Sequence, residues 1–512
     1  MERGSMEKEP SLQAAASQTK SDDRNLVDLQ QMPSRKLFNP LSTLSLVVSL
    51  MATWEGFLAA MGAGLASGGP ISLVYGFLVA FFGSLCIALS ISEPASMFPR
   101  AGGQYNIIAA LSPPRFRALL SWFCTHLTVM GWIGLGASVP FLGSQLIQAL
   151  IGLNNITYEP QRWQGTCIYW GIVLLAYGTN IWGYRVLHIV GNVMMVLHIV
   201  FFIAVLLCVA ILPPTRNSTS FVFTEFINLS GWESDGVAWC LGMLTSAYTM
   251  IGYDSAMHLS EEMQRPEIGV PRAMVGSMVL NGVMGLGLVI GILFGMGDIQ
   301  TALSSGTGYP IIEIFFFICR GNKIGATVLT CTIVVAASLA TMGVIASSSR
   351  TIWAAARDGA TPFSTWLSQL DSKQEVPRRA VTVTTSFLIL IGLLNIASTT
   401  ALNAILSLPV VALSTSYAFP IAGMLYKRIR MPEELNYGPW KLPGKLGVFV
   451  NIGALCYISF LTVFLFFPPI QPVNAVNMNY ASLLYGAVIL FSAVGWFVSG
   501  RNKYTGPKAL QY

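Results

Sequence analysis

The sequence contains few charged residues for its length. Asp, Glu, Lys and Arg together make up 10% of its 512 residues, whereas soluble proteins carry about a quarter. A chain with so few charges cannot cover several soluble domains with a hydrated surface. The composition therefore excludes a soluble multidomain protein. The net charge of +6 is spread along the whole chain, and we expect no nucleic-acid partner.

The sequence also lacks the motifs of most enzymes and metalloproteins. Its eight cysteines show no paired spacing, which argues against a disulfide framework and against a zinc site. The Gly-rich segment 101–105 follows an apolar run, without the preceding strand that a phosphate-binding loop needs. No nucleophile motif is present either. We therefore expect neither an enzyme nor a bound cofactor or metal ion.

Apolar residues are abundant, at 54% of the chain, and the mean hydropathy is +0.62. A helix needs about 20 mostly apolar residues to cross a membrane. Stretches of this kind predict an all-α polytopic membrane protein with twelve transmembrane helices. They lie near 41–65, 71–92, 118–151, 164–182, 186–212, 237–258, 274–296, 325–347, 380–398, 402–426, 447–468 and 480–499.

The segments outside these spans suggest the remaining organisation. The short apolar stretch from Pro310 to Cys319 predicts an interfacial helix between the seventh and eighth spans. Residues 1–39 are polar and predict a disordered tail. We expect a cytoplasmic loop at 428–446 and a short cytoplasmic tail at 501–512. No cleavable signal peptide is expected, because the first apolar run follows the tail and is too long.

The basic residues are distributed unevenly between the two sides of this twelve-span map. Because Lys and Arg are enriched in cytoplasmic loops, the richer side, which carries both termini, is expected in the cytoplasm. Three N-x-S/T sequons, at Asn155, Asn217 and Asn228, all fall in predicted outer loops, as glycosylation sites do. Of the 29 Lys and Arg residues, those expected on the outer side are Arg162, Arg216, Arg320 and Lys323.

Three acidic residues lie within the predicted spans or at their ends. A carboxylate near the bilayer centre costs about 2.5–3.5 kcal/mol on insertion scales, so it marks a functional site by default. Glu55, deep in the first span, either serves the site or only hydrogen-bonds to a neighbouring helix. Asp254, in the inner half of the sixth span, either serves the site or is hydrated from the cytoplasm. Glu93 is expected to be a structural anchor.

Glycines accompany the two deeper acids, Gly56 beside Glu55 and Gly252 near Asp254. Glycine weakens a helix, and Gly-interrupted spans at matching positions in two halves indicate a transporter site. The first and sixth spans cross in opposite directions, as an inverted five-plus-five repeat requires. We expect both helices to unwind there; the alternative is glycine packing between helices. Four histidines either relay protons or, as we expect for each, have a helix-packing or interfacial role: His126, His188, His198 and His258.

Several segments resemble a known transporter family. They are SGGPISLVYG at 67–76, SEPASMFPRAGGQY at 92–105, LSPPR at 111–115, and the segments 260–273 and 347–359. They are similar to the fungal amino acid/choline/GABA permeases of the amino acid–polyamine–organocation superfamily, in order from about Leu41 to Trp496. The resemblance implies a LeuT-type core of ten helices in two inverted repeats over 40–427. Two peripheral helices follow over 447–500, and the implied mechanism is alternating access.

The resemblance also implies which residues bind the solute. Tyr248 falls where the superfamily has an aromatic gate, and Asp254 matches a position that is acidic in some proton-coupled relatives. Many members bind the substrate carboxylate through a Gly-Ser/Thr-Gly run in the first span, which this sequence lacks. Its replacement by an acid beside aromatic groups favours a cation instead. The implied substrate-binding residues are Trp54, Glu55, Gly56, Phe57, Tyr248, Ile251 and Gly252.

These observations together predict a secondary transporter of the plasma membrane. Its expected solutes are small amine-bearing molecules, namely an amino acid, choline or GABA, with protons as the coupled ion through Glu55 and Asp254. Two alternatives stay open: a nutrient sensor that keeps the fold, and an internal-membrane carrier that serves a dedicated pathway. The tails 1–39 and 501–512 are too short for a folded signalling domain, which disfavours the sensor.

Overall fold

The computed structural model describes residues 36–183, 187–371, 375–397, 399–475 and 477–507. Within these residues the regular elements are helices, accompanied by two isolated β-bridges, Phe38 with Met263 and Ser67 with Asn228. The all-α fold is therefore confirmed. Most of the predicted tail 1–39 lies outside the described residues. The packed unit starts at Leu37, three residues before the expected start of the core.

Ten helices in the described part are long and apolar enough to cross a membrane, which confirms a multi-pass membrane protein. The fourth predicted span corresponds to α7 (Arg162–Ile181) and the sixth to α10 (Asp235–Thr249) with α11 (Ser255–His258), and neither is among these ten. The count of twelve therefore stays a prediction. The ten are α2 (Pro40–Met51) with α3 (Thr53–Ala66), α4 (Gly69–Met97), α6 (Pro114–Asn154), α8 (Leu187–Ile211), α12 (Pro266–Gly295), α15 (Lys323–Arg357), α17 (Arg378–Ala397), α18 (Thr399–Arg430), α19 (Gly444–Phe464) and α20 (Ala481–Gly495) with its continuation to Lys503.

Short helices connect the long ones. The expected helix near Pro310 is present as α14 (Pro310–Ile318), whose residues Ile311, Ile314 and Phe315 are buried. The hydropathy pattern did not identify the others, because each is too short or too polar to form an apolar run. They are α5 (Gln104–Leu111), α9 (Thr219–Thr224), α13 (Ile299–Leu303) and α16 (Ser364–Leu367).

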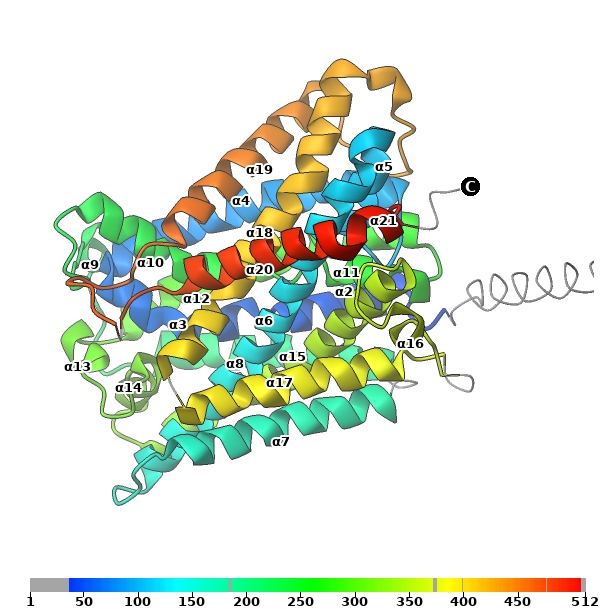
Figure 1. Cartoon of the computed structure of the whole chain (residues 1–512). Helices are drawn as coiled ribbons and strands as arrows, with labels where there is room; N and C mark the ends of the chain where they lie inside the picture. The colour runs from blue at the N-terminus through cyan, green and yellow to red at the C-terminus, as the bar shows by residue number, and fades with distance from the viewer. Residues whose placement is uncertain (1–35, 184–186, 372–374, 398, 476, 508–512) are drawn as a thin grey trace, which may run out of the picture. The chain divides into compact units, whose positions relative to one another are not determined.

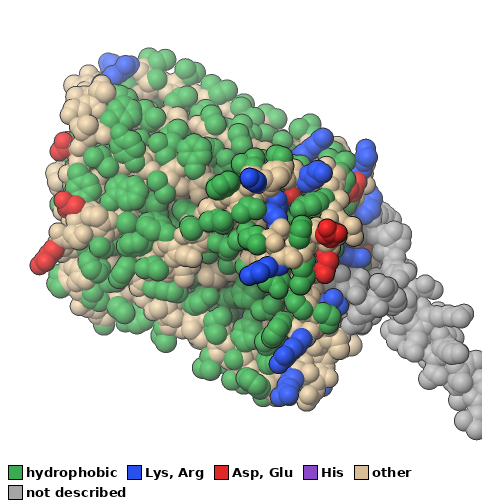
Figure 2. Space-filling model, turned by 90° about the horizontal axis from the view of Figure 1, so that it is seen from above, with side chains coloured by type: hydrophobic (Ala, Val, Ile, Leu, Met, Phe, Trp, Pro, Cys, Tyr) green, Lys and Arg blue, Asp and Glu red, His purple; other side chains and the backbone are tan. Residues whose placement is uncertain are grey.

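The packed unit has two distinct ends. Helices α16 and α21 (Arg501–Lys503) lie at one end, which we call the terminal face, and α9, α13 and α14 lie at the other, which we call the loop face (Figure 1). Figure 2 shows a broad hydrophobic surface between the ends, with Lys and Arg side chains gathered at one of them. This is the distribution of a protein whose middle lies in a bilayer.

The interrupted helices lie inside the bundle, surrounded by intact ones. Helix α2 packs against α8, α12 and α15, and α10 packs against α3 and α4. The contact between α10 and the end of α3 depends on a small residue. A Cβ atom on Gly242 would lie 1.8 Å from the carbonyl oxygen of Ser67, so only glycine lets α10 approach the end of α3 so closely.

Ion pairs close the terminal face. Glu93 on α4 is buried, pairs with Arg428 and accepts a hydrogen bond from the amide of Leu442 (3.0 Å), as expected of an anchor. Glu261 is held by both terminal nitrogens of Arg357 (2.7 and 2.8 Å). Burial raises the pKa of Glu261, but Arg357, the amide of Ala101 and the charge of Arg100 together more than offset this, so its pKa is lowered. The second of these pairs involves the last residue of α15.

Candidate functional site

The first span is interrupted at Ala52, which has φ 41 and ψ 47 and both ends α2 and begins α3. The expected position was Trp54 to Phe57, so the break lies two residues earlier than the sequence predicted. Gly56 is helical, and its amide donates to the carbonyl of Ala52 (2.8 Å). A left-handed alanine costs about 1–2 kcal/mol, which tertiary contacts around the break must offset.

The sixth span is interrupted where the sequence predicted. Helix α10 ends at Thr249, and the chain becomes helical again only at Ser255. Gly252 in between has φ +97, a conformation that L side chains rarely adopt. The residue therefore needs to be glycine for a conformational reason, beyond any close packing.

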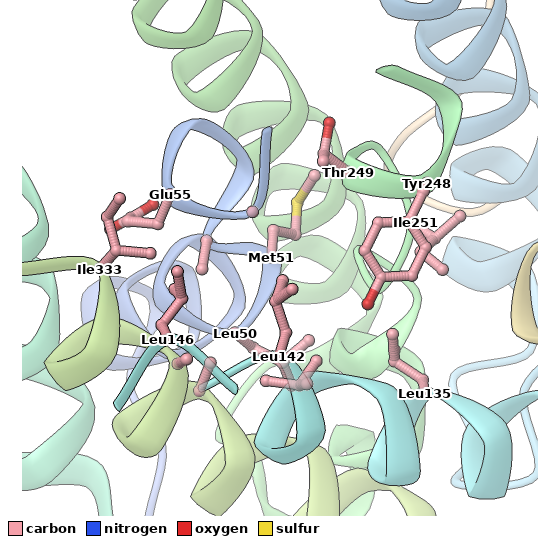
Figure 3. Close-up of a pocket in the computed structure, with 15 residues that line it drawn as sticks. Leu50, Met51, Glu55, Leu135, Leu142, Leu146, Tyr248, Thr249, Ile251 and Ile333 are labelled. Carbon is pink, nitrogen blue, oxygen red and sulfur yellow. The ribbon is translucent and has the colours of Figure 1, made fainter. Parts of the chain in front are cut away.

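A cavity of about 40 Å³ lies between the two breaks, measured as the space open to the centre of a water molecule. Figure 3 shows Glu55 and Ile333 on one side and Tyr248 and Ile251 on the other. Apart from Glu55, Tyr248 and Thr249, the side chains that line it are apolar: Leu50, Met51, Ala52, Leu135, Val139, Leu142, Leu146, Ile251, Ile333, Ala337 and Ala340, with Gly56 beside them.

Four of the predicted substrate-binding residues therefore come together at this cavity: Glu55, Gly56, Tyr248 and Ile251. The other three lie behind its wall. Trp54 is buried against Phe202, and Phe57 packs edge-to-face on Phe77 (centroids 5.7 Å apart). Gly252 shapes the break itself.

Glu55 is the buried acid of the site, with 2% of its side chain exposed. It lies in the first turn of α3, where the helix dipole favours a carboxylate. Oε1 is 2.7 Å from Nδ1 of His198 on α8, whereas Oε2 is buried without a hydrogen-bond partner. We expected His198 to pack between helices; the sequence did not predict its hydrogen bond to Glu55. The two residues are 143 positions apart, so no local pattern indicates their contact.

Tyr248 connects the cavity to α6. Its side chain lines the cavity from α10, and its hydroxyl donates to Oγ of Ser138 (3.0 Å). The ring is thus held from both ends, by its own helix and by α6. Across the cavity, this ring lies opposite Glu55 (Figure 3).

Asp254 lies outside the cavity and is fully buried, so the alternative of a carboxylate hydrated from one side of the membrane is wrong. His258, four residues later in the same segment, contacts this carboxylate through Nε2 (3.3 Å). The remaining partners come from separate segments of the chain, so the sequence could not identify them. The other donors are Gln104 (2.7 Å), Trp132 (3.1 Å) and Tyr417 (2.9 Å). Among the described residues, no group of three His, Cys, Asp or Glu could hold a metal ion.

The three sequons differ in accessibility. Asn155 is exposed, and its amide oxygen accepts from the hydroxyl of Thr157 (2.8 Å). The amide nitrogen of Asn217 instead donates to the backbone at Leu293 and Gly297. Asn228 likewise donates to the carbonyl of Trp232 (2.8 Å). Asn155 is thus the sequon whose amide nitrogen is free of such bonds in this fold.

Comparison with known proteins identifies the family. Residues 38–489 match a family model described as amino acid permease. A choline transporter of Saccharomyces cerevisiae is 30% identical over 92% of this chain and 82% of its own length. Amino-acid permease 2 of Neurospora crassa is 31% identical over 96% of this chain and 90% of its own length. The chain therefore belongs to the amino acid permease family of membrane transporters and is not an enzyme.

Proposed function

We propose that this protein is a secondary transporter that moves a small amine-bearing solute by alternating access. The observation that carries the proposal is Glu55, a buried carboxylate with one unpartnered oxygen at a cavity between two interrupted helices. A buried charge is costly unless it is paired. An ammonium group is the partner of opposite charge that a solute can bring to it.

The chemistry of the cavity narrows the solute class. Its lining is mostly apolar, which suits the carbon chain of a small amine, and Tyr248 supplies an aromatic face for the cation. The names of the relatives, a choline transporter and amino-acid permeases, support the same class. Choline, GABA and amino acids are the proposed solutes. The proposed substrate-binding residues are Trp54, Glu55, Gly56, Phe57, Tyr248, Ile251 and Gly252.

Proton coupling is a further part of the proposal. An amine and a proton can each neutralise Glu55, so the two compete for the same charge. Asp254, the other buried acid next to a helix break, is the second candidate proton site, and its hydrogen-bond donors make the ionised form the alternative to be tested. Competition at these acids would link the movement of the solute to the movement of protons.

The proposed location is the plasma membrane, with both termini in the cytoplasm and the bundle in contact with lipid. The uneven distribution of Lys and Arg along the sequence supports this orientation. Epitope tags beside Lys8 and Lys508 should be protected from antibody in intact cells. Labelling of either tag from outside would contradict the orientation.

Uptake in a permease-deficient host tests the function, with labelled choline, GABA and amino acids as the panel. We expect at least one of these amines to accumulate. Glu55→Gln keeps the shape and removes the charge, and should lose at least about tenfold in uptake, or about 1.4 kcal/mol. Glu55→Asp should keep part of the activity. Wild-type uptake by Glu55→Gln across pH 5 to 8 would show that Glu55 is only a structural hydrogen-bonding residue.

A further inference from the structure

A buried histidine, His198, lies next to Glu55. Glu55 and His198 are each 2% exposed, and Nδ1 lies 2.7 Å from Oε1. The atoms at the far ends of the pair, Oε2 of Glu55 and Nε2 of His198, are both buried without a hydrogen-bond partner. Glu55 lines the main cavity, and both residues line a second cavity of about 10 Å³ together with Ser49. The pair thus lies between two spaces.

Counting protons shows what this pair can do. A hydrogen bond between Nδ1 and Oε1 needs one proton, whichever of the two atoms carries it. With that single proton the pair has a net charge of −1. With a second proton the pair is neutral. In water imidazole is a stronger base than a carboxylate, and the adjacent carboxylate favours the charged imidazolium, so we place the second proton on Nε2 rather than on Oε2.

We propose that His198 holds, on Nε2, the proton that a cationic solute displaces. When Nε2 carries its proton the pair is neutral and offers no net charge to an ammonium group. When Nε2 has lost it, the pair is negative and Oε2 can bind the cation. Binding of one cation therefore releases one proton. This inference rests on the proposed function and assigns the exchanged proton to His198 rather than to Glu55 alone.

Among the residues that line the two cavities, the titratable ones are Glu55, His198 and Tyr248. Helix α8 packs against α2, α12 and α15. Helix α2 carries no titratable side chain, and on α3 Glu55 is the one that titrates. Tyr248 is the further titratable group at the main cavity. On the remaining neighbours and on α8 itself the titratable groups are Glu267 and Arg272 early in α12, Lys323, Cys331, Arg350 and Arg357 on α15, and His188 and Cys208 on α8.

The smaller cavity provides a place for the released proton. Its volume is about the space that a single water molecule needs. A water there would lie next to His198 and Ser49, with a hydroxyl and an imidazole as polar neighbours. Trp54 covers the ring of His198 at 5.9 Å between centroids, so the imidazole is held in place from the other side.

The test measures proton release by the purified full chain in lipid nanodiscs. Choline, GABA and arginine are added separately in weakly buffered solution with a pH indicator. For a probe that binds, we expect about one proton released per molecule bound at pH 6. Its apparent affinity should also fall by at least about tenfold between pH 8 and pH 5, since one proton and one cation exclude each other. The uncharged choline analogue 3,3-dimethyl-1-butanol should release none.

His198→Gln removes the titration while keeping a donor for Glu55. We expect it to bind the same probe without releasing a proton and with an affinity that no longer depends on pH. His188→Gln, ten residues earlier on α8, is the matched control and should behave like the wild type. A wild-type protein that binds a probe with no proton release, or a His198→Gln protein that still releases one, overturns the role of His198. Failure of every probe to bind would instead overturn the proposed function.

Discussion

Thr53, at the start of α3, donates a hydrogen bond from its hydroxyl to the carbonyl oxygen of Thr249, the last residue of α10 (2.9 Å). The bond joins the two interrupted helices directly at their breaks. It also satisfies one of the carbonyls at a helix end, which lack partners within the helix. A solute between Glu55 and Tyr248 therefore acts on two helices that are already held to each other.

Gly56 and Gly252 should respond differently to the same substitution. At Gly252 the backbone has φ +97, and a Cβ atom would lie 2.8 Å from Leu50. At Gly56 the backbone is helical, and a Cβ atom would make an ordinary 3.4 Å contact with Thr249. We expect Gly252→Ala to lose most uptake, because alanine is strained by about 1–2 kcal/mol in this region. Gly56→Ala should keep uptake near the wild-type level.

Uptake per molecule at the cell surface measures both variants. Gly56→Leu serves as the comparison, since its side chain would fill the cavity and should abolish uptake while surface expression stays near normal. Wild-type transport by Gly252→Ala would show that the left-handed conformation is not needed. Wild-type transport by Gly56→Leu would show that the solute does not enter this cavity.

The aromatic ring of Tyr248 should matter more than its hydroxyl. Tyr248→Ala removes the ring from the cavity, at a cost of about 0.5–2 kcal/mol if the solute is a cation. Tyr248→Phe keeps the ring and loses only the bond to Ser138. We therefore expect Tyr248→Ala to weaken apparent affinity in uptake assays more than Tyr248→Phe. Ser138→Ala removes the same bond from the other side and should match Tyr248→Phe. Equal effects of the two Tyr248 variants would contradict an aromatic gate.

The sequence predicted the features that have a local physical cause. The long helices follow from runs of about 20 apolar residues, and the break at Gly252 follows from a residue that weakens helices. The break at Ala52 has no such signal, because alanine is the best helix former. Tertiary contacts produce it, among them the bond between Thr53 and Thr249.

The sequence did not predict the hydrogen bond between Glu55 and His198, because the two residues lie far apart in the chain. Glu55 and His198 were each visible as unusual residues in apolar spans, yet their contact joins positions 143 residues apart. It depends on the rotation of α8 against α3, which hydropathy does not determine. The same holds for Asp254, whose donor Tyr417 lies 163 residues away.

Asn155 should be the glycosylated sequon. It is exposed, whereas the amide nitrogens of Asn217 and Asn228 are bonded to backbone carbonyls that a glycan would displace. We expect Asn155→Gln to abolish the mobility shift that a glycosidase produces on gels. Asn217→Gln and Asn228→Gln should leave this shift unchanged. A shift that survives in Asn155→Gln would place the glycan at another site.

Asp254 is either a proton carrier or an ionised hub, by which we mean a permanently charged carboxylate that accepts hydrogen bonds from several segments. Its two carboxylate oxygens accept from Gln104, Trp132 and Tyr417, and Nε2 of His258 lies 3.3 Å from Oδ2. Three donors directed at the carboxylate suit the ionised form, which only accepts. Asp254→Asn puts an amide NH₂ where an acceptor is needed, so at least one buried donor loses its partner. Each such loss costs about 1–3 kcal/mol. We therefore expect Asp254→Asn to lower the unfolding temperature of the purified protein.

Tyr417→Phe provides the complementary change, since it removes one donor and leaves the carboxylate with the others. It should be less destabilising than Asp254→Asn. Glu267→Gln, at a partly exposed acid on α12, is the control and should unfold like the wild type. For a proton carrier the expected result is the opposite, because asparagine resembles a protonated aspartate and would be accommodated. An Asp254→Asn protein as stable as the wild type, with transport that has lost its pH dependence, would therefore identify Asp254 as a proton site instead of an ionised hub.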